Sequence, residues 1–310
     1  MLSSATDASL LAAATGADVP PLTPSALVTE SVADPVVLTL LVLAAGLYLW
    51  GVHRLRLRGD HWNAGRTVSF LLGGLGSIAL ATLSGLAAYE DVLFSLHMIQ
   101  HMVLSMIAPI FLALGGPITL ALRTLPRAGR ARRRLLAVLH SRAVQILTFP
   151  LIPFLLFVAS PFALYFTGWY AATLSNPWLH ELMHVHFLLA GCLFFWPLIG
   201  LDPVPGRVGY PMRMLILVAT LPLHAILGLT IMNQTDLLAA EHYLALDLPW
   251  SDPVSEQRVG GGLLWSSGDL VGLLMLGAAA FQWMRASERE ATREDRWLDR
   301  RDDLRTRNDG

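Results

Sequence analysis

The sequence predicts an all-α polytopic membrane protein, a bundle of seven transmembrane helices. The chain is 54% hydrophobic with a mean hydropathy of +0.54, and it contains several apolar runs of about 20 residues, the length that crosses a bilayer. Its net charge of −1 provides no basic field for nucleic acid. The single cysteine, Cys192, excludes an internal disulfide, and the absence of lysine among the 22 basic residues excludes a retinal Schiff base.

Composition divides the chain into three regions. Residues 1–35 are rich in Ala, Ser, Thr and Pro and lack arginine, so we expect a loosely ordered extracytoplasmic leader. Residues 36–284 form the predicted seven-helix transmembrane domain. Residues 285–310 mix Arg with Asp and Glu, which predicts a solvated, partly helical cytoplasmic tail.

The seven predicted spans alternate with short polar connections. The second span is rich in Gly and Ala, which suits close helix packing. Pro109 should kink the third span and Gly115-Gly116-Pro117 should end it, while three prolines predict a bent fourth span. The spans cover residues 36–53, 67–88, 94 to about 115, 143–166, 177–200, 212–233 and 262–284, leaving 89–94 as an acidic turn, 123–142 as a basic loop and 234–261 as the longest loop.

The distribution of arginine along the chain predicts its orientation in the membrane. With alternating connections, 21 of the 22 arginines fall on one side of the membrane, and Arg258 alone falls on the other. Cytoplasmic loops carry the excess of basic residues, so the N-terminus should lie outside and the C-terminus in the cytoplasm. The basic loop at 123–142 is interpreted as an orientation signal at the lipid headgroups, with membrane lipid as its partner.

Histidines occur inside two spans at a spacing of four. His97 and His101 open the third span, and His180 and His184 open the fifth. Residues at positions i and i+4 lie on the same face of a helix, about 6 Å from each other along its axis. Each pair can therefore line one pocket or chelate one metal. Ionisable side chains within a span are costly and mark functional sites by default.

The topology predicts two further polar groups at the same depth. His224 in the sixth span and Asp269 in the seventh should lie near His101 and His184, in the outer half of the bilayer. Burying three imidazoles at one depth costs free energy unless they have partners, so the three together favour a functional site. A single histidine near a helix end, in contrast, often only bonds to a headgroup. His186 lies off the shared face and receives no metal role.

Thioethers accompany the histidines. Met98 and Met102 flank the first pair and Met183 lies beside the second. Imidazole with thioether suits copper, especially Cu(I), although methionine is more often a core filler. Glu181 and Asp269 keep zinc as an alternative, because zinc prefers imidazole with carboxylate or thiolate.

Three other interpretations stay open. His180-Glu181-Leu182-Met183-His184 fits the short His-Glu-x-x-His pattern of helical zinc hydrolases, with Glu181 as base, and needs a third ligand such as His224 or Asp269. Two facing histidines, such as His101 and His184, can also ligate a b-type haem. A metal-free scaffold, whose histidines are satisfied by hydrogen bonds, is the structural alternative.

Three stretches resemble a known family. HMIQHMVLSMIAPIFLALGGPITLALR (97–123), HELMHVHFLLAGCLFFWPLIGLDPVP (180–205) and GGGLLWSSGDLVGL (260–273) are similar to the multi-span, CtaG-type cytochrome c oxidase assembly proteins of bacteria. The resemblance implies a plasma-membrane protein that is required for active haem-copper oxidase and has a proposed role in copper delivery. Carried over by position, the matching residues are His97, His101, His180, His184, His224, Trp265 and Asp269.

The leading hypothesis is a non-enzymatic copper-binding protein. It would take metal from an extracytoplasmic copper donor and pass it to a haem-copper oxidase subunit. His101, His184 and His224 would form the principal Cu(I) site, and His97 and His180 an outer relay. The supporting residues would be Met98, Met102 and Met183 as soft ligands, with Asp269, Glu181 and Trp265 beside the ligands.

Overall fold

The computed structural model describes residues 19–308, in which every regular element is a helix. Residues 1–18 of the predicted leader, and residues 309–310, lie outside the described residues. Six helical spans are long and apolar enough to cross a membrane, and a bent pair of helices makes a seventh if it is taken as one span. The membrane-protein class with six or seven spans is therefore confirmed. The spans are Pro35–Leu57, Ala64–Tyr89, Phe94–Thr124, Pro177–Ile199, Tyr210–Asn233 and Pro253–Trp297, with the bent pair at residues 151–175.

The first two spans follow a short helix, α2 (Ala26–Thr29). Helix α3 (Pro35–Leu57) begins where the Asp34 carboxylate accepts hydrogen bonds from the next free backbone N–H groups. The second span contains a wide π turn, at which Gly73 and Gly74 lie directly against the third span, and the extended backbone of Ser84 interrupts its helix near the end. Its segments are α4 (Ala64–Val68), η2 (Ser69–Leu75), α5 (Gly76–Leu83) and α6 (Gly85–Tyr89).

The third span confirms one expectation and corrects another. A π turn, η3 (Val103–Ile107), precedes Pro109, where a distortion was expected because proline lacks the N–H of a regular helix. The span does not end at Gly115-Gly116-Pro117. Gly116 adopts a left-handed conformation (φ 61°) that breaks the helix, and a new helix then continues to Thr124. The remaining segments are α7 (Phe94–Met102), α8 (Ala108–Gly115) and α9 (Pro117–Thr124).

Asp202 explains why the helix resumes. Its side chain is 1% exposed and accepts hydrogen bonds from the backbone N–H groups of Ile118 (3.2 Å) and Thr119 (2.8 Å). It also accepts one from the Trp196 indole (3.0 Å). This carboxylate satisfies the free donors at the start of α9, as a capping residue does.

The fourth span is interrupted just before Pro150, one of the three prolines that predicted a bend, whereas Pro161 lies inside a continuous helix. The basic connection before it contains α10 (Arg130–Leu139), and α11 (Arg142–Leu147) leads into α12 (Leu151–Tyr165). Helix α13 (Trp169–Ser175) then turns by 74° relative to α12. Its residues were expected to form a linker rather than a helix.

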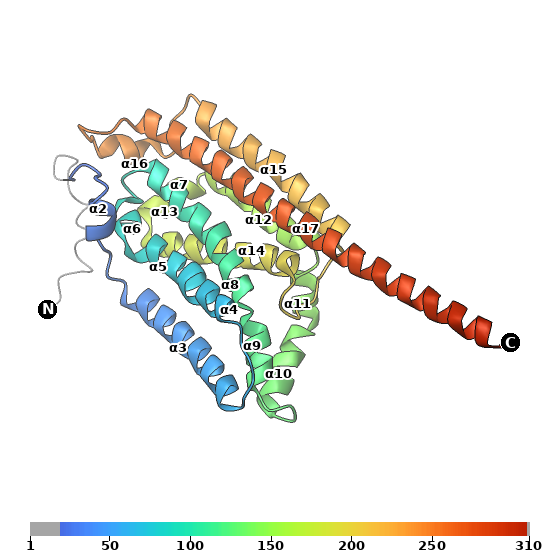
Figure 1. The fold of residues 1–310 in the computed structure, drawn as a ribbon. Helices are drawn as coiled ribbons and strands as arrows, with labels where there is room; N and C mark the ends of the chain where they lie inside the picture. Colours follow the sequence, from blue (N-terminus) through green and yellow to red (C-terminus); the bar gives the residue numbers. More distant parts are fainter. Residues whose placement is uncertain (1–18, 309–310) are drawn as a thin grey trace.

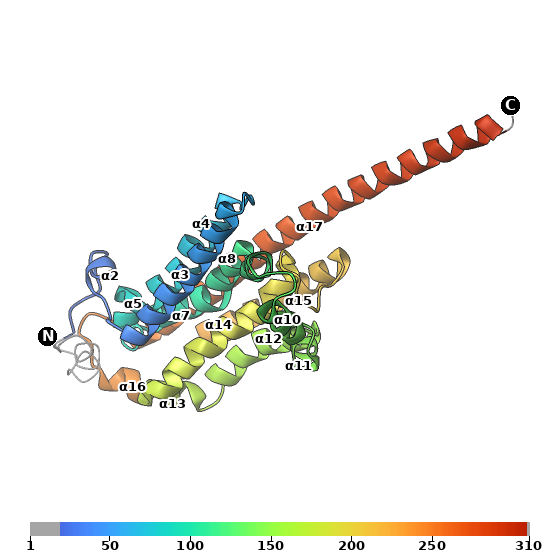
Figure 2. The ribbon, with the colours of Figure 1, turned by 90° about the horizontal axis from the view of Figure 1, so that it is seen from below.

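The last helices are α14 (Pro177–Ile199), α15 (Tyr210–Asn233), α16 (Ala240–Ala245) and α17 (Pro253–Asn308). Helix α17 begins at Pro253, within the predicted 234–261 loop, because the Asp252 side chain accepts a hydrogen bond from Ser255 N (3.0 Å) and starts the helix early. It lies beside α15 and then projects from the bundle (Figures 1 and 2). The tail thus continues α17, with exposed side chains through Trp297.

The bundle has two distinct ends. Helices α2, α6, α13 and α16 gather at one end, on the left of Figure 1, and α9, α10 and α11 at the other. We call these the α16 end and the α10 end. Helices α7 and α14 both begin at the α16 end, so their first turns lie together there.

Candidate metal centre

Both predicted histidine pairs meet at the α16 end. The rings of His97 and His101 on α7 are 4.1 Å apart between centroids, and those of His180 and His184 on α14 are 4.5 Å apart. Across the two helices, His97 lies 5.5 Å from His180, and His101 lies 6.0 Å from His184. All four residues are buried. The four imidazoles therefore form one contiguous cluster.

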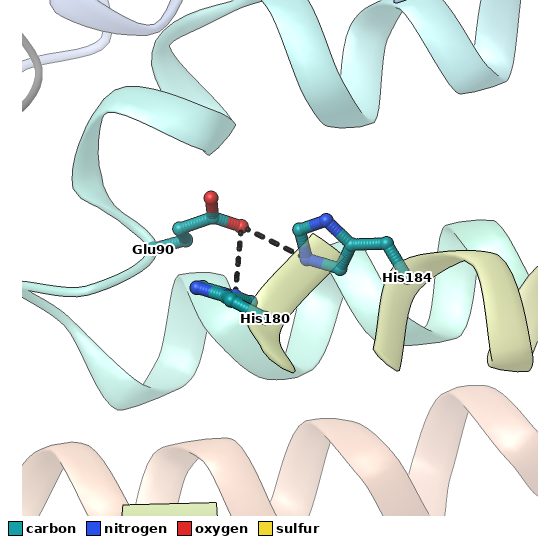
Figure 3. A group of neighbouring side chains, drawn as sticks. All are labelled: Glu90, His180 and His184. Carbon is teal, nitrogen blue, oxygen red and sulfur yellow. Dashed lines mark ion pairs between the residues drawn. The ribbon is translucent and has the colours of Figure 1, made fainter. Parts of the chain in front are cut away.

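Glu90 completes a set of ligand atoms. It follows α6 and points into the cluster, as Figure 3 shows. Its Oε2 lies 3.4 Å from His184 Nε2 and 3.8 Å from His180 Nε2. These three atoms lie within 4.8 Å of one another, so a single metal ion could contact all of them after small shifts.

Other carboxylates face the opposite nitrogens of the same rings. Asp91 Oδ1 lies 3.3 Å from His180 Nδ1, and Glu181 Oε2 lies 3.8 Å from His184 Nδ1. A carboxylate on the far side of an imidazole fixes its tautomer and directs the other nitrogen toward a metal. Burial raises the pKa of the Asp91 carboxyl above its usual value, although the nearby His180 acts in the opposite direction.

Several buried polar atoms in the cluster lack a partner. His97 is fully buried, and neither ring nitrogen meets hydrogen-bond geometry within the described residues, although the Glu90 backbone carbonyl interacts with the ring. Glu90 Oε2 and His180 Nε2 face each other at 3.8 Å but likewise make no hydrogen bond within the described residues. Each such atom costs about 1–3 kcal/mol, so a cluster of them indicates a site completed by a ligand. The residues present therefore fit a metal ion.

A glutamine side chain is hydrogen-bonded to His184. Gln100 is fully buried, and its amide nitrogen donates to the Ala81 carbonyl at 3.0 Å. Its oxygen therefore faces His184 Nε2 at 3.0 Å and accepts a hydrogen bond from it. A metal at this nitrogen must displace that proton, so binding is coupled to pH.

The segment containing α16 packs over the cluster. The His242 ring donates from Nε2 to the Asp91 backbone carbonyl at 2.7 Å, and the hydroxyls of Tyr243 and Tyr170 lie 2.5 Å apart. Tyr243 is buried against the ring of Phe94. This segment, which belongs to the longest predicted loop, thus covers the end of the bundle.

His224 stands apart from the Glu90 group. Its Nδ1 donates to the Thr220 carbonyl at 3.4 Å, and its ring lies 5.4 Å from that of Phe157. The ring packs against Gly268, where an added Cβ would lie 2.8 Å from His224 Cδ2. Asp269 interacts electrostatically with His224, and its Oδ1 is buried without a hydrogen-bond partner in the described residues. The expected proximity of these two residues is therefore present.

The predicted soft ligands and the tryptophan are dispersed. Met102 lines a small cavity with His101 and His224. Met98 packs against Gly260 of α17, where an added Cβ would lie 3.1 Å from its Cγ. Met183 lines an apolar cavity of about 440 Å³ beside α12 and α13, together with His186. Trp265 is 38% exposed and packs against Gly228 at the contact between α15 and α17.

The family model described as cytochrome c oxidase caa3 assembly factor matches residues 46–286 of the chain. The chain belongs to the caa3 assembly factor family. The uncharacterized proteins Mb0105 of Mycobacterium bovis and MT0111 of Mycobacterium tuberculosis are each 42% identical over 264 residues, which is 83% of this chain. The uncharacterized protein ML1998 of Mycobacterium leprae is 39% identical over 267 residues, or 84% of this chain. The chain spans about 40% of the length of each relative, and no solved structure matches it.

Sequence reasoning missed Glu90, Asp91 and Gln100. The two carboxylates were interpreted as part of an acidic turn, and the glutamine as an ordinary span residue. A signal was present, because the turn immediately precedes α7 and therefore lies at the same end of the bundle as His97 and His180. Comparing the depth of the connecting turns in the membrane, as well as that of the spans, would have placed Glu90 near the histidines.

Proposed function

We propose that this assembly factor binds copper at the α16 end of the bundle and passes it to a haem-copper oxidase subunit. The observation that carries the proposal is the convergence of His180 Nε2, His184 Nε2 and Glu90 Oε2 within 4.8 Å. The buried, unpartnered nitrogens of His97 lie beside them. Membership of an oxidase assembly family connects this site to a copper-containing enzyme.

Copper fits the donor atoms. A site of imidazole and carboxylate binds Cu²⁺ more tightly than Zn²⁺ in the general order of divalent metals. Cu(I), the form favoured by the soft ligands nearby, accepts two or three imidazoles, and the fourth ring of the cluster supplies an exchange partner. Neutral imidazoles that share one ion suit a handover by ligand exchange, because each bond can be replaced in turn.

Charge supports entry of the metal from outside the cell. Arginines crowd the α10 end, which the positive-inside rule places in the cytoplasm. The α16 end would then face outward, where a copper donor can reach it. This end carries a group of acidic residues that attract cations, namely Glu90, Asp91, Asp236, Glu241, Asp247, Asp252 and Glu256.

One observation favours a zinc hydrolase as the second candidate. Glu90 supplies the third ligand that the His-Glu-x-x-His segment lacks, giving the His₂Glu set of zinc peptidases. However, Glu181 faces His184 Nδ1, on the side of the ring opposite the metal-binding nitrogen, where it cannot activate a metal-bound water. Glu181→Gln would abolish hydrolysis under this alternative, whereas a copper site would keep most of its affinity.

The haem and scaffold alternatives are less well supported. The rings of His101 and His184 have centroids 6.0 Å apart in a packed cluster, and the cavity beside His101 measures only about 20 Å³. That volume holds one small molecule or ion, not a porphyrin. A metal-free scaffold leaves the unpartnered nitrogens of His97 without an explanation.

The copper content of the oxidase tests the proposal in cells. A strain that carries His180→Ala/His184→Ala in place of the wild-type gene should assemble oxidase with less copper and lower activity. His186→Ala is the matched control, because His186 lies on the same helix but lines the apolar cavity. Normal copper content in the double variant would refute the delivery role.

A further inference from the structure

A second cluster of ligand-type side chains lies deeper along α7, away from Glu90. A cavity of about 20 Å³ is lined by His101 and Met102 of α7 and by His224 of α15. Ser105 and Tyr165 also line it, and Phe157, Pro161, Phe187, Leu227 and Leu264 supply the apolar walls. A cavity of this size accommodates one water-sized particle or a single ion.

The tautomer of His224 is determined by its partner. Its Nδ1 faces the Thr220 carbonyl at 3.4 Å, and a carbonyl can only accept a hydrogen bond, so Nδ1 carries the proton. Nε2 of the neutral ring therefore keeps its lone pair, as a metal ligand requires. Gly268 allows α17 to press directly against this ring and hold its orientation.

His101 is arranged in the same way. Its Nδ1 is hydrogen-bonded to the Tyr165 hydroxyl at 2.7 Å, while its Nε2 is buried without a hydrogen-bond partner among the described residues. The residue itself is only 4% exposed. A buried imidazole nitrogen without a hydrogen-bond partner, in a residue that lines a cavity with mostly apolar walls, indicates a ligand position in that cavity. When Nδ1 donates to the hydroxyl, Nε2 is free to bind a metal.

Met102 sets the chemical class of the occupant. Met102 lines the same cavity, is 9% exposed, and is the residue of the lining that carries a thioether. Two neutral imidazoles and a thioether form a soft donor set without a carboxylate in the cavity wall, which suits Cu(I) and discriminates against Zn²⁺ and Ca²⁺.

One residue, His101, borders both clusters. The His101 ring lies 4.1 Å from His97 and 6.0 Å from His184, and it also lines the deeper cavity. A ligand that borders both sites can exchange a metal between them without an intervening aqueous step.

We infer that the cavity between His101, Met102 and His224 is a second, internal Cu(I) position, filled from the Glu90–His180–His184 site. This inference rests on the copper-binding function proposed above and adds a storage or transfer step within the membrane. The position is distinct from the outer site because it contains no carboxylate and includes sulfur. Asp269 interacts with His224 from α17 and would offset part of the added positive charge.

The test is anaerobic titration of the detergent-purified full chain with Cu(I) against a chromophoric Cu(I) chelator. His224→Ala should bind one Cu(I) fewer than the wild type, while Glu90→Gln/His180→Ala should lose the outer ion and keep the inner one. His186→Ala, in the other cavity, should match the wild type. Equal stoichiometry in wild type and His224→Ala would overturn the inner position, whereas no copper in the wild type would instead refute the proposed function.

X-ray absorption gives a second readout if His224→Ala does not fold. The Cu(I)-loaded wild type should show a sulfur neighbour at the copper, and Met102→Leu, which conserves side-chain volume, should remove it. Met98→Leu is the matched control, because Met98 faces Gly260 rather than the cavity. A copper spectrum without sulfur in the wild type, or one that Met102→Leu leaves unchanged, would overturn the inference.

Discussion

At the scale of single residues, the centre depends on which nitrogen of each ring is directed inward. Glu90 faces the Nε2 atoms of both His180 and His184, while Asp91 and Glu181 face their Nδ1 atoms. The carboxylates therefore have two roles. In the proposed site Glu90 would contribute a ligand oxygen, and the other two would orient the rings.

Replacing Glu90 should weaken copper binding more than replacing any other carboxylate at this end. Glu90→Gln removes the anionic oxygen that both Nε2 atoms face, so we expect the affinity to fall by at least about tenfold. Competition titration with a chelator of known affinity measures the change. Glu241→Gln, an exposed carboxylate on α16, is the control, and equal affinities in the two variants would contradict the ligand role of Glu90.

Asp91 links pH to stability. A carboxyl pKa raised in the folded state adds stability below the usual carboxyl pKa, and this contribution is lost as the pH rises through the folded-state pKa. Asp91→Asn should therefore raise the Tm of the metal-free protein at neutral pH. The gain should not exceed about 2 °C, because the side chain is 35% exposed and water screens it.

The gain from Asp91→Asn should shrink as the pH falls toward about 4, the usual carboxyl pKa, and should disappear below about 3, where the carboxyl is protonated in the folded and unfolded states alike. Thermal unfolding followed by intrinsic fluorescence across this pH range checks the direction. A Tm that falls at neutral pH, or a gain that grows toward acid pH, would show that Asp91 stabilises the fold in its charged form.

At the scale of elements, close backbone contacts position the histidine-bearing helices. Gly191 of α14 lies against the π turn of the third span, where an added Cβ would overlap the Ser105 carbonyl oxygen and lie 2.7 Å from Pro109 Cγ. Because this backbone cannot move aside easily, the register of α14 against η3 and α8 of the third span depends on glycine at this position.

Gly191→Ala should thus destabilise the protein by about 1–3 kcal/mol and weaken metal binding by shifting His184. Gly277→Ala in α17 is the matched control, since no other atom lies within 4 Å of its added Cβ and alanine is the better helix former. Thermal unfolding and copper titration of both variants test this. An unaffected Gly191→Ala would mean that the two helices can slide without consequence.

Asp202 anchors the opposite end of the same helices. Replacing it with alanine removes the acceptor for Ile118 N, Thr119 N and the Trp196 indole, so we expect a loss of about 2 kcal/mol or more. Because Asp202 lies at the α10 end, copper stoichiometry should not change. A variant that unfolds normally but loses copper would place Asp202 in the metal pathway instead.

At the scale of the whole molecule, the arginine distribution predicts an outward-facing metal centre. The expected topology can be tested by cysteine labelling in intact cells, after Cys192→Ala removes the native thiol. Glu241→Cys should react with a membrane-impermeant maleimide, and Arg130→Cys should react only after the membrane is permeabilised. The reverse pattern would place the centre in the cytoplasm and exclude delivery from outside.

Much of this architecture could be predicted from the sequence, because hydropathy and histidine spacing report on individual helices. The i,i+4 pairs on α7 and α14 lie together as their periodicity indicated. What could not be predicted depends on contacts across the chain. Asp202 restarts the helix after Gly116, Asp252 begins α17 early, and the turn containing Glu90 folds back over α14.

The central claim is that the His–Glu cluster at the α16 end binds copper. The most direct measurement is the copper content of the detergent-purified protein after anaerobic Cu(I) loading and removal of free metal, compared between wild type and His180→Ala/His184→Ala. The account predicts bound copper in the wild type and the loss of at least the outer ion in the double variant. Equal copper content in the two proteins, or none in either, would contradict it.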